Sequence, residues 1–513
     1  MSLFDANCML GRRVAPVGRA GTATVEWLLA EMDRLGIADA LVYHGLALDG
    51  HPARGNAGLL DEIRLQPRLH AAWILLPNTG ELPPPARLID EMRAAGVRAA
   101  RIHPGHHRFD LSIAALGDLL EALEEARIPL FVDFDRPRWS RGATDWRGLV
   151  DIAGRHPHLP IVLVGAGIDA PRNLFPIWPR YPNLYLETSY YQVHQGLSEI
   201  ASRFGPERLL FGTGLPGRAA GPPLAQLASE PLSADWRVAI GGNTLHALLS
   251  RAGKVHRVEE IATPPPPCAH MPVLDLHGHL GAWPLSYVHR GDAEGLLESM
   301  DRIGIQAMAL SAFDAIGPDV CGGNDEVAAA VRRHPGRFFG YGVVDPNQPE
   351  LVLAEVRRCI ERLGLHGLKV HAALHDVPVD AEAYGPALEY ANAHGLCVLV
   401  HGRITAALLE RYPRAQFLAA HAGGWDGRGT SEPAELTRRH ANLYLDLAAS
   451  TVHQGVLEHL CAAVGAERIV YGSDAPLHDP SYQLGRVLYA QLTFAQKEQI
   501  LYRNARRLFG LAS

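Results

Sequence analysis

The segment NLYLDLAASTVHQG, residues 442–455, repeats the segment NLYLETSYYQVHQG, residues 183–196, at a distance of 442 − 183 = 259 residues. Directly downstream, GAERIVYGSDAP from Gly465 repeats GPERLLFGTGLP from Gly205, and these lie 465 − 205 = 260 residues apart. A period of this length is that of a whole domain, and (β/α)8 barrels have about 250 residues. We therefore predict one fold that occurs twice along the chain.

The repeat extends upstream of these segments. MDRLGI (residues 32–37) returns as MDRIGI (300–305), and Gly55-Asn56 returns as Gly323-Asn324, both at an offset of 300 − 32 = 268 residues. A proline-rich segment separates the two copies, and neither a helix nor a central strand can continue through it. The predicted domains are residues 1–262 and 273–513, joined by a linker at 263–272.

Short apolar runs alternate with amphipathic stretches in the second copy, which is typical of βα units around a parallel sheet. Helical spacing of apolar residues is clear at 292–303 and 349–363. A doubly wound three-layer sheet is the competing α/β architecture. Eight successive strand patterns, five of which end in metal-binding residue types, favour two tandem TIM-type (β/α)8 barrels. The predicted strands of the second barrel are 273–277, 306–311, 338–344, 367–371, 396–401, 416–420, 442–447 and 468–473.

The composition limits the kinds of partner. Hydrophobic residues make up 47% of the chain and charged residues 20%, and the formal net charge is −7. Such a chain can bury large cores, and it has no stripe of positive charge for nucleic acid. We expect a small-molecule substrate, no nucleic acid, and an intrachain pseudo-dimer of the two barrels, with assembly into a homo-oligomer as a further option.

The cysteines and the apolar runs bear on the compartment. The six cysteines are scattered and form no CxxC motif, which argues against a disulfide framework and a cysteine-based zinc site. No apolar run approaches the ~18 residues of a membrane span, and the opening residues lack a secretory pattern. We expect a cytoplasmic protein without a membrane association.

The first strand predicted in the second copy ends in Asp275-Leu-His-Gly-His279. Alternate side chains of a strand point to the same side, so His277 and His279 can offer imidazole nitrogens to one ion. With 26 histidines in the chain, an HxH motif also arises by chance. The other strand ends therefore have to support it.

Three more predicted strands end in groups of the same kind, at His401, His421 and Asp474. Barrel enzymes place their chemistry at the carboxyl ends of the strands, so these groups would converge at one mouth. Taken singly, a helix N-cap at Asp474 or a hydrogen-bonded loop histidine at His421 explains each residue equally well. Their convergence favours a metal centre.

The combination of DxHxH, a histidine on the fifth strand, HxGG on the sixth and GSDxP on the eighth resembles the amidohydrolase superfamily. The resemblance covers the second half, and it is to the branch of metal-dependent hydrolases and related decarboxylases that includes aminocarboxymuconate-semialdehyde decarboxylase. It implies one divalent ion, Zn with Mn as the alternative, bound by His277, His279, His401 and Asp474. Asp474 would also be the catalytic general base, and His421 the catalytic group beside the substrate.

Lys369 and His371 lie two residues apart on the predicted fourth strand and should point inward together. A carboxylated Lys369 that bridges two metals is one interpretation. The first copy keeps a similar pair, Arg101 and His103, where no metal is expected. We therefore favour a cation and an imidazole that bind an anionic substrate group.

Three residues of the predicted mouth loops, Trp283, Arg403 and Trp425, are also candidates for substrate contact. Their alternative is an ordinary loop role.

In the first copy all five site positions have changed, and they hold Asn7, Met9, Asp133, Gly165 and Gly214. An amide, a thioether and a carboxylate do not form the nitrogen-rich shell that zinc prefers. We predict no metal in the first barrel and a structural role for it. The alternative is a ligand site that uses Asp5, Asp133 and His103.

Three functions are compatible with these residues. The favoured one is metal-dependent hydrolysis of an amide, lactone or ester in a small, neutral or acidic substrate, with a metal-activated water. The first alternative is non-oxidative decarboxylation of a small aromatic or unsaturated acid, because the metal can also bind a carboxylate or phenolate. The alternative of another class is a non-catalytic binding or scaffold protein, and the intact ligand set argues against it.

Overall fold

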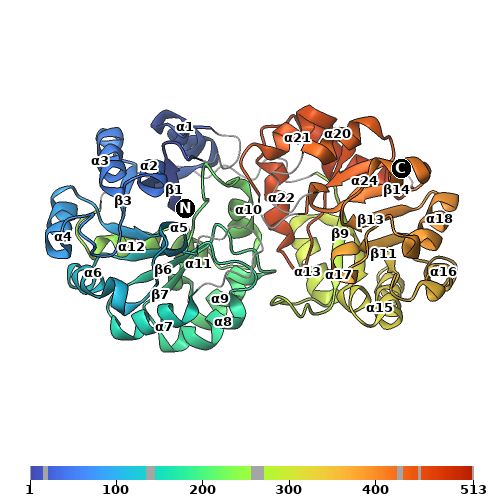
Figure 1. Cartoon of the computed structure of the whole chain (residues 1–513), viewed down its shortest axis with the longest axis horizontal. Helices are drawn as coiled ribbons and strands as arrows, with labels where there is room; N and C mark the ends of the chain where they lie inside the picture. The colour runs from blue at the N-terminus through green and yellow to red at the C-terminus, as the bar shows by residue number, and fades with distance from the viewer. Residues whose placement is uncertain are drawn as a thin grey trace. The chain divides into compact units, whose positions relative to one another are not determined.

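The structure is a computed structural model that describes residues 2–14, 21–134, 145–255, 271–423, 431–448 and 452–510. The chain divides into two compact units, residues 1–192 with 196–265, and residues 266–513 with Val193–Gln195. Each unit contains one sheet of eight parallel strands in sequence order, with helices around it (Figure 1). The two tandem (β/α)8 barrels predicted from the sequence are confirmed.

The strands and helices of the first barrel alternate along the chain. Its strands are β1 (Leu3–Leu10), β2 (Ile37–His44), β3 (Leu69–Ile74), β4 (Ala99–Ile102), β5 (Leu130–Asp133), β6 (Ile161–Val164), β7 (Leu184–Glu187) and β8 (Leu209–Leu210). Its α-helices are α1 (Val25–Leu35), α2 (Gly45–Asp49), α3 (Pro52–Ile63), α4 (Pro85–Ala94), α5 (Pro104–His107), α6 (Ile113–Ala126), α7 (Trp146–Arg155), α8 (Pro171–Ile177), α9 (Gly196–Phe204), α10 (Gly221–Ser229), α11 (Ala234–Val238) and α12 (Thr244–Ser250).

The second barrel follows the same order. Its strands are β9 (Val273–Leu280), β10 (Ile305–Ala312), β11 (Phe338–Val343), β12 (Gly367–His371), β13 (Cys397–His401), β14 (Gln416–Ala419), β15 (Leu443–Asp446) and β16 (Ile469–Val470). Its α-helices are α13 (Ala293–Ile303), α14 (Phe313–Ile316), α15 (Val320–Arg333), α16 (Pro349–Arg357), α17 (Ala372–His375), α18 (Gly385–His394), α19 (Ala406–Arg411), α20 (Ser431–Arg439), α21 (Val456–Val464), α22 (Pro480–Leu488), α23 (Phe494–Glu498) and α24 (Asn504–Leu508).

Local sequence explains where the helices begin and end. Helix α13 begins after Asp292, whose carboxylate accepts from the amide of Gly295 at 2.7 Å, and it ends at Gly304, where φ is 79°. An acidic N-cap and a left-handed glycine are common helix boundaries. The predicted helix at 349–363 is present as α16, followed by a π-helical turn at Arg358–Arg362. No helix in the described ranges is long and apolar enough to cross a membrane.

Each barrel closes through backbone hydrogen bonds between its first strand and the segment that follows its eighth strand. In the second barrel the amide of Leu276 donates to the carbonyl of Tyr471 at 3.0 Å, and that of His279 donates to Ala475 at 2.7 Å. In the first barrel the amide of Ala6 donates to Phe211 at 2.8 Å. The closed sheet therefore brings together the ends of the first and eighth strands, which are far apart in the sequence.

The eighth strand is shorter than the predicted strand at 468–473. Strand β16 has only two residues, because the amide of Tyr471 donates to the carbonyl of Ile500 and that of Ser473 donates to the carboxylate of Asp275. Strand β9 is longer than predicted, so that His279 lies within it. The apolar pattern located both strands but not these departures from the sheet.

Candidate metal centre

Six of the predicted site residues lie on the strands of the second barrel or directly after them, and all six are buried. His277 and His279 are on β9, Lys369 is on β12, and His401 is the last residue of β13. The remaining two follow strands, His421 in the turn Ala420–Gly423 after β14 and Asp474 after β16.

Three of these side chains form a compact cluster. Nε2 of His279 lies 3.0 Å from Oδ1 of Asp474, and Nε2 of His277 lies 3.5 Å from the same oxygen. One ligand atom from each of the three lies within 4.8 Å of the others. Tetrahedral ligands about 2.1 Å from an ion stand roughly 3.4 Å apart, so two imidazoles and a carboxylate at these distances fit a divalent metal.

The other nitrogen of each imidazole is held from outside the cluster. Nδ1 of His277 lies 2.5 Å from Oδ2 of Asp446, at the end of β15, and Nδ1 of His279 lies 3.0 Å from Oγ of Ser311 on β10. Such contacts orient metal-binding histidines and leave Nε2 available. Asp446 and Ser311 are not among the residues predicted from the sequence. The acidic residue at the end of both repeated segments, NLYLE and NLYLD, was a signal for Asp446.

Lys369 is fully buried beside the cluster. Its Nζ lies 3.0 Å from Nε2 of His277. Burial lowers the pKa of Lys369 to about 8. Because a neutral imidazole nitrogen has one lone pair, metal binding at this Nε2 would displace the hydrogen bond from Lys369.

The other three predicted histidines, His371, His401 and His421, pack in a row next to the cluster. The ring of His371 stacks on that of His401 at a centroid distance of 3.9 Å, and the rings of His401 and His421 lie 4.8 Å apart. Nδ1 of His421 contacts the carbonyl of Ala448 at 2.6 Å. His401 is therefore near the compact cluster without being one of its three members, and its role as a ligand stays a prediction.

The pKa shifts in the site favour the protonation states in which these side chains can bind a metal ion. Burial holds the pKa values of His277 and His401 well below the ordinary histidine value, and burial also lowers the pKa of His279. Burial alone would raise the pKa of Asp474, but His277 and His279 outweigh it and hold that pKa well below its usual range. Neutral imidazoles and an ionised carboxylate are the forms that bind a metal.

Two site residues have an unusual backbone conformation. His421 has φ of 58° and Asp474 has φ of 63°, in the left-handed region that residues with a side chain rarely adopt. The equivalent residues of the first barrel, Gly165 and Gly214, have φ of 79° and 74°. The two copies thus share the turns, and the second has His421 and Asp474 where the first has glycines in these left-handed positions.

The loop candidates have different surroundings. Trp283 packs on Phe313 with ring centroids 4.9 Å apart, and Phe313 stacks on His279 at 4.6 Å. Arg403 is exposed and pairs with Glu432 at 2.8 Å, so the structure does not bring it to the cluster. Trp425 lies outside the described residues.

An arginine takes the central position in the first barrel. Arg101, equivalent to Lys369 because 369 − 101 = 268, donates to Oδ1 of Asn7 at 2.9 Å and to Oδ2 of Asp133 at 2.5 Å. Asn7 and Asp133 stand where the second barrel has His277 and His401. Among the described residues, only His277, His279 and Asp474 form a cluster with metal-ligand spacing.

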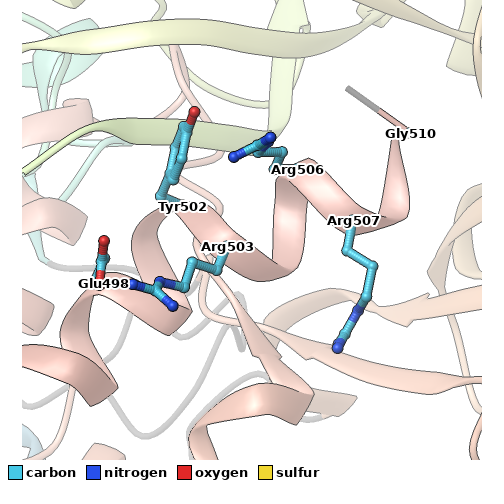
Figure 2. A pocket seen from close by; sticks show the side chains of 6 residues that line it. All are labelled: Glu498, Tyr502, Arg503, Arg506, Arg507 and Gly510. Carbon is cyan, nitrogen blue, oxygen red and sulfur yellow. Dashed lines mark ion pairs between the residues drawn. The ribbon is translucent and has the colours of Figure 1, made fainter. Parts of the chain in front are cut away.

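The second barrel also has a pocket of about 690 Å³ that none of these site residues lines. Figure 2 shows the residues that line it, which lie on α23, on the π-helical segment Gln499–Arg503, on α24 and just after α24: Glu498, Tyr502, Arg503, Arg506, Arg507 and Gly510. Arg503 pairs with Glu498 at 2.8 Å, and Arg507 donates to the carbonyl of Glu467 at 3.1 Å. We place no chemistry there, because these arginines have partners within the chain.

Comparison with known proteins gives a family and several relatives. The family model described as Amidohydrolase matches residues 14–250 and 269–511. A gamma-resorcylate decarboxylase of Polaromonas sp. is 23% identical over 279 residues, which cover 41% of this chain and 85% of that protein. A 2-amino-3-carboxymuconate-6-semialdehyde decarboxylase of Dictyostelium discoideum is 24% identical over 240 residues, which cover 37% of this chain and 65% of that protein.

Solved structures give similar but weaker matches. A 2,6-dihydroxybenzoate decarboxylase complexed with 2,6-dihydroxybenzoate has 19% identity and a TM-score of 0.39, and the match covers 47% of this chain and 99% of that chain. A 5-carboxyvanillate decarboxylase from Novosphingobium aromaticivorans, complexed with manganese and a nitrobenzoic acid, has 15% identity and a TM-score of 0.41, with 47% and 97% covered.

Proposed function

This chain belongs to the amidohydrolase family, and we propose that its second barrel is a metal-dependent decarboxylase that removes CO2 from a small aromatic or unsaturated acid. The observation that carries the proposal is the buried cluster of His277, His279 and Asp474 beside the side chain of Lys369. A divalent ion and a buried amine together suit a substrate with more than one anionic oxygen.

The choice of decarboxylation over hydrolysis follows the relatives. Both curated relatives named above are decarboxylases, of gamma-resorcylate and of an amino-carboxymuconate semialdehyde. Hydrolysis, favoured from the sequence, uses the same ligands and becomes the second candidate. The chain's own residues support the choice, since Lys369, His371 and His421 surround the cluster with groups that can bind an acid.

We assign the metal to His277, His279 and Asp474, with His401 as the fourth ligand, and propose Zn or Mn as the ion. When bound, a divalent ion supplies a Lewis acid for the oxygens of the substrate. Lys369 would bind an anionic oxygen of the substrate, and His421 would orient the reacting carboxylate. In this proposal the first barrel holds no metal.

The proposed decarboxylation breaks one bond and needs one proton. The bond between the ring or chain carbon and its carboxylate breaks, CO2 leaves, and the electron pair stays on the carbon, which then takes a proton. His277 and His279 keep Asp474 ionised in the resting site, so we propose that its carboxylate takes a proton from water as the substrate enters and then delivers that proton to the carbon. Burial of the site keeps bulk water from competing.

The test uses the full chain loaded separately with Mn²⁺ and Zn²⁺. We expect CO2 release from at least one of 2,6-dihydroxybenzoate, 5-carboxyvanillate and 2-amino-3-carboxymuconate semialdehyde, and at least a 100-fold loss of turnover in Asp474→Asn, because an amide cannot carry the proton. Ester or lactone cleavage without CO2 release would favour hydrolysis. Absence of both activities and of bound metal would favour the non-catalytic alternative.

A further inference from the structure

The carboxylate of Asp446 uses both of its oxygens at the end of β15. Oδ1 accepts from the amide of Ala448 at 2.6 Å, two residues further along the chain, and Oδ2 contacts Nδ1 of His277 at 2.5 Å. Asp446 is fully buried and His277 is 1% exposed. One oxygen therefore anchors the carboxylate to its own backbone, while the other meets the imidazole across the barrel.

The contact on the opposite side of His277 indicates which nitrogen carries the proton. Nε2 of His277 lies 3.0 Å from Nζ of Lys369, a group with hydrogens to donate. Nε2 is then the acceptor, and the proton of the neutral imidazole is on Nδ1, where it can be donated to Asp446. This tautomer is the one that leaves the Nε2 lone pair facing Asp474 and the metal position.

A glycine makes room for the pair. A Cβ on Gly472 would lie 2.3 Å from Oδ1 of Asp446 and 2.8 Å from Cβ of His277. Both distances are too short for a side chain, so any residue other than glycine would force Asp446 and His277 to move. The contact between these two side chains is thus built into the packing of the barrel wall.

The first barrel keeps the same arrangement without metal-binding residues. Glu187, equivalent to Asp446 because 446 − 187 = 259, accepts from Nδ2 of Asn7 at 3.1 Å and from the amide of Ser189 at 2.6 Å. A Cβ on Gly212 would lie 2.0 Å from Oε1 of Glu187. Glu187 is longer than Asp446, and Asn7 is shorter than His277, so the acid and its partner still reach each other between the two strands. The first barrel therefore offers a matched control for the second.

We propose that Asp446 is a positioning residue that fixes the tautomer and the ring orientation of His277, so that Nε2 points to the metal position. The inference rests on the proposed metal centre and names a residue outside its ligand set. Asp446 itself touches neither substrate nor metal in this assignment. Its effect on the metal passes through His277, the ligand that it contacts, and so it should appear in metal affinity before any catalytic measurement.

The experiment measures the affinity of the full chain for Zn²⁺ and Mn²⁺ by chelator competition at one pH, together with the melting temperature of the metal-free protein. We expect Asp446→Asn to bind metal 10- to 100-fold more weakly, as is typical when an outer partner of a ligating histidine is removed. The control Glu187→Gln makes the same chemical change in the first barrel and should leave metal affinity within twofold. Metal binding by the unaltered chain tests the proposed metal centre separately. Failure of the metal centre can therefore be distinguished from failure of the positioning role of Asp446.

A second pair of variants disturbs the contact between Asp446 and His277 without changing either of these residues. Gly472→Ala should weaken metal binding in the same direction as Asp446→Asn, and Gly212→Ala should not. The positioning role is overturned if Asp446→Asn binds metal as the unaltered chain does, or if the first-barrel controls lose as much affinity. It is also overturned if both second-barrel variants lose their folded structure, because Asp446 would then be a structural residue.

Discussion

Lys369 and Arg101 occupy equivalent positions in the two barrels and carry the same charge in different surroundings. Nζ of Lys369 lies 3.0 Å from Nε2 of His277. If His277 binds a metal through this nitrogen, Lys369 is released from the contact. Arg101 is engaged by Asn7 and Asp133 and stacks over the ring of Tyr43 at 4.0 Å. A guanidinium has a planar fork of donors and is suited to such permanent pairing, whereas an amine is a compact charge that can change partner.

Methionine at each position separates the two roles. Lys369→Met should lower kcat/KM for an acidic substrate at least 10-fold and strengthen metal binding several-fold, because Nζ no longer competes for Nε2 of His277. Steady-state kinetics and chelator competition measure the two effects. Arg101→Met should change neither, and it should destabilise the first barrel by roughly 2 kcal/mol, because the partly buried ion pair between Arg101 and Asp133 is lost. Weaker metal binding in Lys369→Met would contradict the competition.

The left-handed conformation of Asp474 gives a stability prediction. Glycine adopts φ of 63° without strain and alanine does not, at a difference of about 1 kcal/mol. Asp474→Gly should therefore be more stable than Asp474→Ala by about that amount, the reverse of the usual order, and both should be inactive. Chemical denaturation of the metal-free variants measures the difference. Equal stabilities would mean that the turn relaxes when the carboxylate is removed.

At the scale of elements, the repeated Gly-Asn pair ties a helix to a strand in each barrel. Asn324 on α15 donates to the carbonyl of Val343 at 2.9 Å and accepts from its amide at 2.9 Å. Asn56 on α3 does the same with Ile74, at 2.9 and 3.0 Å. The preceding Gly323 leaves no room for a side chain, since a Cβ would lie 2.3 Å from the amide nitrogen of Ala315. This conserved spacing between the copies is structural.

Removing either asparagine should destabilise its own barrel. Asn324→Ala and Asn56→Ala each leave a buried amide and a buried carbonyl at a strand end without their partner, at a cost of roughly 2–4 kcal/mol. The exposed Asn173→Ala is the control and should stay within about 0.5 kcal/mol. Thermal unfolding of the metal-free proteins provides the measurement. A loss below 1 kcal/mol at both sites would show that other groups take over the hydrogen bonds.

At the scale of the whole molecule, the two barrels share a fold and differ in their centres. The cluster of His277, His279 and Asp474 has metal-ligand spacing, whereas the centre of the first barrel is filled by the guanidinium of Arg101. The duplication has thus kept the turns and hydrogen bonds of the barrel and changed the residues that carry its chemistry. The pairing of the two barrels within the chain stays a prediction.

Metal stoichiometry follows from this difference. Purified chain saturated with Zn²⁺ or Mn²⁺ should contain one ion per chain, measured by elemental analysis. Because a ligand stabilises only the state that binds it, removal of the ion should raise hydrogen–deuterium exchange within residues 271–510 and leave 21–255 unchanged. Two tightly bound ions per chain, or protection by metal in the first barrel, would contradict the assignment of a single centre.

The duplication, the two (β/α)8 barrels and the placement of His277, His279 and Asp474 on or after the first and eighth strands of the second barrel could all be predicted from the amino-acid sequence. These are local properties, because alternation of apolar residues and the residue that ends a strand can be read within a few positions. Which side chains contact one another became visible only in the folded barrels. His277 contacts Lys369 and Asp446, which are 92 and 169 residues away, and Arg101 fills the first barrel through Asn7, 94 residues away. Such contacts depend on the closed sheet and on side-chain packing between distant strands, and no pattern within one segment encodes them.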